Sequence, residues 1–274
     1  SWKGTCAIKG CCSRFLYEVA LSPSAYERSI AMIEQQLETP DAGILHENFI
    51  TIKPGDPSST LYCFFFNSDD LYLQYKDIAC ALPEDVRVMG IRRPECRSFC
   101  TIEEYAIDSV ERILSSQKEG PFHLAGFCFG GLIALKAAMI LEERGFQVNC
   151  CMIDMPYHKQ KIKYYIEYGV LYYLARRKWL YLRLNPGLRH ELRRNAKKYN
   201  YKTMWKREFR FRGHCIIFLG KHMYYRDSYK GYELNLARHF DRPELICVDE
   251  KHLDFLKGPG SLKVAAAISK WFNS

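Results

Sequence analysis

The stretch Gly126-Phe127-Cys128-Phe129-Gly130-Gly131 decides how this 274-residue chain is expected to fold. Its spacing is that of a nucleophile elbow, G-x-nucleophile-x-G, a tight strand-to-helix turn that holds the nucleophile in a strained backbone conformation. Glycines on both sides of the turn let neighbouring backbone pass without a Cβ clash. The pattern predicts that Cys128 is a nucleophile at a helix N-terminus, where the helix dipole favours the thiolate. The alternative is that Cys128 is a buried structural cysteine, because free cysteines are among the residues most often buried.

Short apolar runs and helical patterns alternate on both sides of this turn. Alternation at these lengths implies an α/β fold with a mainly parallel sheet and helices on both faces. We expect strands over residues 50–53, 60–66, 86–91, 123–127, 148–153, 215–219 and 244–248. We expect helices over residues 75–82, 101–116, 129–144, 232–240 and 261–272.

Two segments depart from this alternation. Residues 1–45 begin with a Cys-rich stretch and show no strand and helix alternation, so we interpret them as a linker or N-terminal extension. The α/β domain then covers residues 46–274. Residues 157–205 directly follow a strand and carry apolar residues at helical spacing. We interpret them as a helical lid inserted over the carboxyl edge of the sheet, where α/β proteins bind their ligands.

The positive charge of the chain is concentrated in one segment. Residues 157–212 hold seventeen Lys and Arg against three acidic residues, a local charge of about +14, whereas the whole chain carries +9. A partner of this lid should therefore be acidic. The alternative is a solvated helical face whose Tyr and Leu side chains pack on the sheet. Basic patches with aromatics also suit nucleic acid, but no known nucleic-acid-binding module is present, so we expect no nucleic acid.

The cysteines and the N-terminus indicate a cellular compartment. The twelve cysteines are scattered, and no C-x-x-C pair or Cys/His array has zinc spacing, so we expect buried free thiols in a reducing compartment and no metal. The start, Ser1-Trp2-Lys3-Gly4, has neither a Met nor an apolar signal region, which favours an excised cytoplasmic domain. Lys136 interrupts the longest apolar run, so no membrane span is expected.

A thiol nucleophile needs a base to take its proton and a third group to orient that base. In sheets with a nucleophile elbow, the acid and then the histidine follow the nucleophile, each after a strand. Asp154 follows the strand 148–153, and His252 follows the strand 244–248. We therefore predict His252 as the base and Asp154 as the acid, with Asp227 as the alternative acid. Three nearby acids are interpreted as solvated charges: Asp249, Glu250 and Asp254.

Two backbone N–H groups are expected to form an oxyanion hole. One is that of Phe129, directly after the nucleophile. The other should come from the loop after the strand 60–66, which reads Asn67-Ser68-Asp69-Asp70. Ser68 is the preferred donor in this loop, and Asn67 is the next.

Taken together, these motifs resemble the thioesterase domains that terminate nonribosomal peptide and polyketide synthases, within the α/β-hydrolase superfamily. The resemblance runs from about Ile50 to the C-terminus. It rests on three stretches and on the placement of the lid and of the His252 loop. The stretches are Gly120-Pro121-Phe122-His123-Leu124-Ala125-Gly126-Phe127-Cys128-Phe129-Gly130-Gly131, Glu142-Glu143-Arg144-Gly145-Phe146 and Ile153-Asp154.

Two departures from the family pattern bear on the chemistry. Cys128 stands where Ser is usual, and residues 67–70 replace an oxyanion loop that is rich in small residues, Pro or Gly in many members. A minority of such domains carry Cys, and some of these make strained or amide-linked products. The family also places its acid at the position of Asp154, which favours this residue over Asp227.

The resemblance implies a chain-releasing thioesterase without an intrinsic cofactor. It would take an acyl or peptidyl chain from the 4′-phosphopantetheine arm of a carrier protein and release it by macrocyclisation to a lactam or lactone, by hydrolysis or by transfer. The basic lid would meet the acidic carrier. The alternatives are a stand-alone editing thioesterase, a non-catalytic carrier-docking domain and a Cys hydrolase of free esters.

Overall fold

The structure is a computed structural model, and it describes part of the chain. The described residues are 49–64, 75–91, 102–155, 209–220, 239–241, 243–252 and 254–272. Several sequence predictions lie outside them: the N-terminal extension 1–45, the lid 157–205, the loop residues Asn67 and Ser68, and the alternative acid Asp227.

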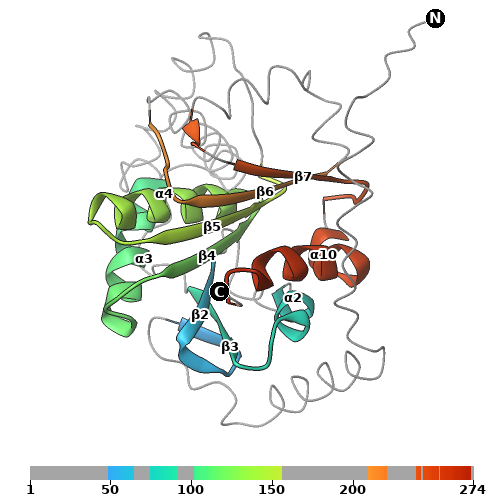
Figure 1. The fold of residues 1–274 in the computed structure, drawn as a ribbon, viewed down its shortest axis with the longest axis horizontal. Helices are drawn as coiled ribbons and strands as arrows, with labels where there is room; N and C mark the ends of the chain where they lie inside the picture. Colours follow the sequence, from blue (N-terminus) through green and yellow to red (C-terminus); the bar gives the residue numbers. More distant parts are fainter. Residues whose placement is uncertain are drawn as a thin grey trace, which may run out of the picture.

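The described residues form a seven-stranded sheet in the order β1-β3-β2-β4-β5-β6-β7 (Figure 1). All neighbouring strands pair parallel except β1 and β3, which pair antiparallel. The mainly parallel sheet expected from the sequence is therefore confirmed. The strands are β1 (Phe49–Lys53), β2 (Asp56–Phe64), β3 (Val86–Ile91), β4 (Phe122–Phe127), β5 (Val148–Ile153), β6 (His214–Gly220) and β7 (Pro243–Val248).

Helices pack on both faces of this sheet, as predicted. The core cluster on one face contains residues of α3 (Ile102–Ser116) and α4 (Phe129–Glu143), and the cluster on the other face contains residues of α2 (Lys76–Ala81) and α10 (Gly258–Ser269). A short 3-10 helix, η2 (Asp254–Leu256), precedes α10.

Most predicted boundaries lie within one residue of the observed ones, but the starts of β2 and α10 and the end of the helix expected over 232–240 differ more. Strand β2 begins at Asp56 rather than at residue 60, because Asp56 already pairs with Val86 before a register shift in the ladder. Helix α10 begins at Gly258 rather than at residue 261, with a proline in its first turn, where the missing N–H costs nothing. Phe240, at the end of the helix expected over 232–240, instead forms a β-bridge with Phe211.

The described cysteines are free of disulfides, and five of them are buried. Burial raises the pKa values of the thiols of Cys63, Cys150, Cys151 and Cys215 above the ordinary value. These four side chains are therefore inert core thiols. Cys128 and Cys247 are the two described cysteines with solvent exposure. Among the described residues, no helix is long and apolar enough to span a bilayer.

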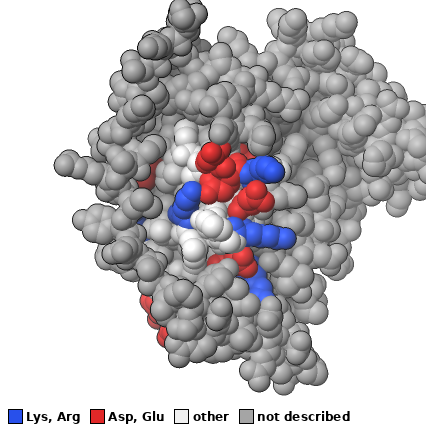
Figure 2. All heavy atoms as spheres, turned by 90° about the vertical axis from the view of Figure 1, so that its right-hand side faces the viewer, with Lys and Arg blue, Asp and Glu red and all other residues white. Residues whose placement is uncertain are grey.

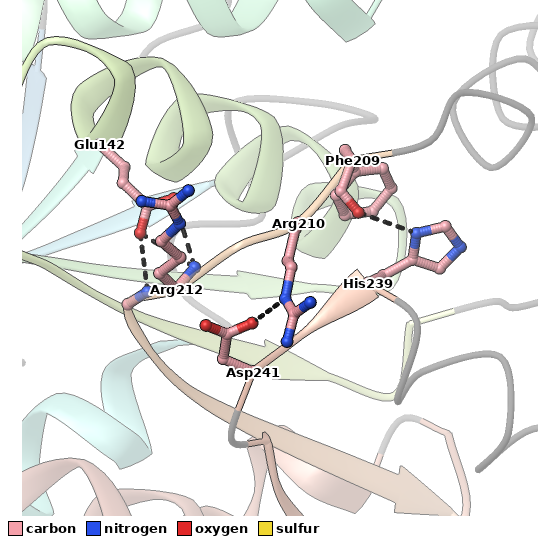
Figure 3. Close-up of polar contacts among 7 residues, drawn as sticks. Glu142, Phe209, Arg210, Arg212, His239 and Asp241 are labelled. Atoms are coloured by element: carbon pink, nitrogen blue, oxygen red, sulfur yellow. Dashed lines mark hydrogen bonds and ion pairs between the residues drawn. The ribbon is translucent and has the colours of Figure 1, made fainter.

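Glu142, near the end of α4, anchors the segment that leads into β6 (Figure 3). Its carboxylate accepts hydrogen bonds from the backbone N–H groups of Arg212 at 3.0 Å and Gly213 at 2.8 Å. Beside this anchor, Arg210 forms an ion pair with Asp241. These contacts fix where the chain enters the sheet on the way to β6.

Candidate active site

The turn between β4 and α4 has the geometry of a nucleophile elbow. Cys128 is the N-cap residue of α4, with φ 52° and ψ −121°, a conformation that non-glycine residues rarely adopt. A Cβ atom at Gly126 would lie 2.3 Å from the carbonyl oxygen of Gly130, and one at Gly131 would lie 3.0 Å from the carbonyl oxygen of Gly126. The glycines are therefore required by close backbone approach, as the motif predicts.

Two hydrogen bonds hold the backbone of this turn. The N–H of Cys128 donates to the carbonyl of Ile153 at the end of β5, at 2.8 Å. The carbonyl of Cys128 accepts from the N–H of Gly131, at 3.1 Å. The thiol is partly exposed to solvent, in contrast to the buried core cysteines. It is thus held at a fixed point and remains accessible.

Asp154 directly follows β5, and its carboxylate is buried, with 1% of the side chain exposed. Its backbone has φ 46°, the second left-handed non-glycine residue among those described. Its N–H donates to the carbonyl of Phe218 in β6 at 2.9 Å, and its Oδ1 accepts from the N–H of Gly220 at 3.0 Å. The second carboxylate oxygen, Oδ2, is hydrogen-bonded to Nδ1 of His252.

His252 joins the thiol to this carboxylate. Nδ1 of the imidazole contacts Asp154, and the ring also hydrogen-bonds to Cys128. The face of the ring packs against Phe127, with 4.6 Å between ring centroids and 32° between ring planes. The hydrogen bond to Asp154, followed by the one to Cys128, raises the pKa of His252 to about 10. This arrangement can accept a proton from the thiol and hold it on the imidazole.

The structure brings Cys128, His252 and Asp154 together from three loops that follow β4, β7 and β5. Phe129, the first predicted oxyanion donor, is the first residue of α4. The prediction for Glu250 as a solvated charge is wrong: this side chain is largely buried and forms an ion pair with Lys263. The loop carrying Glu250 folds back onto the end of β6, where its carbonyl lies 3.1 Å from a Cβ placed on Gly220.

Sequence reasoning missed two residues that contact this site and a third that lies at the end of β2. Gly220 donates to Asp154, and its only sequence signal is a glycine at a strand end, which often marks a close backbone approach. Phe127 lies in the motif, but nothing in the sequence indicates its contact with the imidazole of His252. Tyr75 was recognised only as the start of a helix, yet its hydroxyl lies at the end of β2.

Comparisons with known proteins point to one family. Residues 60–165 match the family model described as Thioesterase domain. Malpibaldin synthetase of Mortierella alpina is 46% identical over 48 residues, which are 18% of this chain and 1% of the synthetase. The non-reducing polyketide synthase PKS12 of Gibberella zeae is 30% identical over 115 residues, 39% of this chain and 6% of the synthase. The chain thus spans 6% or less of the length of these two relatives.

A solved structure shows the same fold. The crystal structure of the NocB thioesterase domain, from the Nocardicin cluster, superposes with a TM-score of 0.56 at 18% identity, covering 83% of this chain and 100% of that chain. The likeness shows the shared architecture of sheet and helices. It agrees with the α/β-hydrolase fold expected from the sequence.

Proposed function

Residues 60–165 belong to the thioesterase-domain family, and from this premise we propose that the chain is the chain-releasing domain of a nonribosomal peptide or polyketide synthase. Its substrate would be an acyl or peptidyl thioester on the phosphopantetheine arm of a carrier protein, with no cofactor bound to the domain itself. The observation that carries the proposal is the contact of His252 with both the partly exposed Cys128 and the buried Asp154. A thiol, a base and an orienting acid are the groups that acyl transfer requires.

The first step transfers the acyl chain to the enzyme. His252 takes the proton of Cys128, and the sulfur attacks the thioester carbonyl, while the N–H of Phe129 and that of Ser68 stabilise the oxyanion. The bond between the acyl carbon and the pantetheine sulfur breaks as the bond to Sγ of Cys128 forms. The departing pantetheine thiolate takes the proton from the His252 imidazolium. One thioester is thereby exchanged for another.

The second step releases the chain. An amine or hydroxyl within the chain, a water molecule or a second acceptor gives its proton to His252 and attacks the acyl carbon, and the sulfur of Cys128 leaves as the thiol. Because the acyl group stays a thioester on Cys128, it keeps the activation that an oxoester on serine would lose. This favours attack by an amine and therefore ring closure to a lactam. Lactone formation, hydrolysis and transfer use the same intermediate.

A basic surface for the carrier is assigned to residues 157–212 from their charge. Figure 2 shows one side of the molecule, where the described acidic and basic side chains are interspersed. On that side the described residues offer no patch of a single sign. The proposed carrier contact therefore rests on the sequence of the basic segment and on the general attraction of basic for acidic surfaces.

Intact-protein mass spectrometry with a synthetic acyl-pantetheine thioester tests the proposal. We expect one acyl group to add to the protein, and Cys128→Ala to abolish the adduct. The matched control is Cys247→Ser, which removes the other exposed described thiol and should leave the adduct unchanged. If iodoacetamide labels Cys128 but no thioester acylates it, the chain is a carrier-docking domain and the proposed enzyme is wrong.

Product analysis separates the modes of release. A substrate with an internal amine should give a cyclic amide from the wild-type protein. Cys128→Ser should hydrolyse the same substrate in greater proportion, because its oxoester is less reactive toward amines. Free acid as the sole product from every substrate, with or without an internal amine, would count against cyclisation and favour an editing hydrolase.

A further inference from the structure

The side chain of Phe127 forms a flat apolar surface beside the proposed base. Phe127 ends β4 and directly precedes Cys128 in the chain. Its ring centroid lies 4.6 Å from that of the His252 imidazole, with 32° between the two ring planes. This distance is within the range in which aromatic rings attract each other. The residue before the proposed nucleophile therefore contacts the residue proposed to take the proton of that nucleophile.

The ring of Phe127 is itself supported by the core. It packs against the apolar cluster that contains Ala125 of β4 and Phe255 of η2, and both of these residues are buried. Strand β4 pairs with β2 on one side and with β5 on the other, and Phe127 stands opposite Ile153 in the second ladder. Because its strand lies inside the sheet and its ring rests on the core, Phe127 offers the imidazole a fixed surface.

The imidazole of His252 needs such a surface, because its ion pair fixes only one of its atoms. Oδ2 of Asp154 is hydrogen-bonded to Nδ1 of His252, and Oδ1 of the same carboxylate accepts from the N–H of Gly220 at 3.0 Å. The torsion that turns a histidine ring about its Cβ–Cγ bond has broad minima, so a bond at Nδ1 leaves the ring free to tilt. The core does not enclose the imidazole either, since 43% of the side chain is exposed.

We infer that Phe127 is a positioning residue for acyl transfer: its ring sets the plane of the His252 imidazole and so the direction in which Nε2 points. The inference rests on the proposed acylation of Cys128 with His252 as the base. A general base acts only within hydrogen-bond reach of the proton that it takes, and a hydrogen bond weakens steeply as its angle closes. Because Phe127 and Cys128 are consecutive residues, the supporting surface and the thiol share the end of one strand.

Two substitutions separate the flat face of the ring from its bulk. Phe127→Leu keeps an apolar side chain but removes the face, and Phe127→Tyr keeps the face. With an acyl-pantetheine thioester, Phe127→Leu should lower the maximal acylation rate constant about 10-fold, a part of the about 100- to 10,000-fold that a positioned base contributes. The half-saturating thioester concentration should stay the same, because the base and not the binding of the thioester is disturbed. Phe127→Tyr should acylate within about twofold of the parent protein.

Phe146→Leu is the matched control. Phe146 follows the end of α4 remote from Cys128, is half-buried, and packs edge-on against Phe122 with 5.2 Å between ring centroids. Phe146→Leu therefore also removes one ring of an aromatic pair. In urea unfolding it should lose stability as Phe127→Leu does, but its acylation rate constant should equal that of the parent protein.

NMR of the histidine ring protons reports the stack itself. The ring current of Phe127 shifts the resonances of the His252 ring protons upfield, because these protons lie over an aromatic face. In Phe127→Leu the resonances should move downfield, and in Phe127→Tyr they should stay near their parent positions. A general loss of stability, as in Phe146→Leu, would leave them in place.

Each outcome decides the role of Phe127. Parent-like acylation in Phe127→Leu, an equal loss in Phe127→Tyr, or unmoved His252 resonances in Phe127→Leu would overturn it. If Phe127→Leu does not fold, Phe127→Met fills the site with a flexible side chain that has no flat face, and the same measurements then decide. If the parent protein is not acylated by any thioester, the proposed function is wrong and this role falls with it, whereas an acylated parent with a parent-like Phe127→Leu overturns the role alone.

Discussion

At the scale of single residues, the imidazole of His252 is held by contacts on three sides. Asp154 binds Nδ1, Cys128 hydrogen-bonds to the ring, and Phe127 packs on its face. The raised pKa, about 10, means that the imidazole holds a proton at neutral pH. A proton taken from Cys128 would therefore stay on the imidazole while the sulfur attacks the thioester.

Replacing Asp154 by Asn should test this assignment. The hydrogen bond to Asp154 is the largest cause of the raised pKa of His252, so Asp154→Asn should move that pKa from about 10 toward its ordinary value near 6.5. As pH rises, the imidazole of the variant would then lose its proton at a lower pH than that of the parent protein. Acylation should fall about 100- to 10,000-fold. Histidine ring NMR titration and thioester acylation measure the two effects.

Asp254→Asn is the matched control for this change. Asp254 begins η2 two residues after His252, and its side chain is exposed. The variant should leave both the His252 titration and the acylation rate unchanged. An unaltered His252 titration in Asp154→Asn would mean that another group sets the protonation of the imidazole.

Gly220 offers a second test of how Asp154 is held. A Cβ at this position would lie 2.9 Å from Phe255 Cε2 and 3.1 Å from Asp154 Oδ1. Gly220→Ala should therefore destabilise the fold by about 1–3 kcal/mol and slow acylation, because the carboxylate must shift. Gly145→Ala serves as control: its φ of 87° costs about 1 kcal/mol, but its Cβ meets nothing within 4 Å. Urea unfolding and acylation assays should show lost stability in both variants and slow acylation in Gly220→Ala alone.

The proximity of residues that carry a motif or a strand-end position could be predicted from the sequence. Cys128, Asp154 and His252 each follow an apolar strand in the chain order that a nucleophile elbow implies, and the structure brings them together. Gly220 and Tyr75 could not be assigned in this way. Their contacts depend on how far β6 and α2 approach the site, and this distance is set by packing between elements that are remote in the chain.

At the scale of elements, the segment before β6 depends on one carboxylate at the end of α4. The carboxylate of Glu142 accepts hydrogen bonds from the backbone N–H groups of Arg212 and Gly213 (Figure 3). Hydrogen bonds to a charged group are stronger than those to a neutral one. Glu142→Ala should lower the free energy of unfolding by about 1 kcal/mol and make the peptide bonds around residues 209–213 easier to cleave in limited proteolysis. Glu143→Ala, at the exposed neighbouring position, should alter neither measurement. Equal effects of the two variants would show that Glu142 is not the anchor.

The interiors of the elements were predicted more accurately than their ends. The bounds of β3 and β5 were predicted as observed, because strands that are mostly buried inside a sheet read as mostly apolar stretches. The start of β2 was missed since its first residues, Asp56 and Pro57, are polar or lack an N–H, and they pair only through a register shift. Such a start depends on the neighbouring strand rather than on local propensity.

At the scale of the whole molecule, a buried histidine links the sheet to the C-terminal helix. His123 of β4 stacks on Trp271 with 5.7 Å between ring centroids, and its Nδ1 lies 3.1 Å from the amide of Asn149 in β5. Burial lowers the pKa of His123 to about 4. The ring is therefore neutral at physiological pH, and Nδ1 accepts the hydrogen bond from Asn149.

The lowered pKa makes folding stability sensitive to acid. Between about pH 6.5 and pH 4 the unfolded chain protonates His123 but the folded chain does not, so stability falls as pH falls through this window. The loss should reach about 2 kcal/mol between pH 7 and pH 5, measured from urea unfolding curves. His123→Gln keeps an acceptor for Asn149 and should flatten the dependence. An identical slope in both proteins would assign the acid sensitivity to other groups.

The backbone hydrogen bonds of Cys128 and Asp154 also predict how readily the backbone of the site opens to solvent. The amide of Cys128 is bound to the carbonyl of Ile153 in β5 and that of Asp154 to the carbonyl of Phe218 in β6, and both of these strand residues are buried. Neither amide can exchange its hydrogen with solvent until neighbouring strands part. Deuterium should therefore enter these two positions on the slow timescale of the central sheet, so the backbone of the site opens only when the sheet itself does.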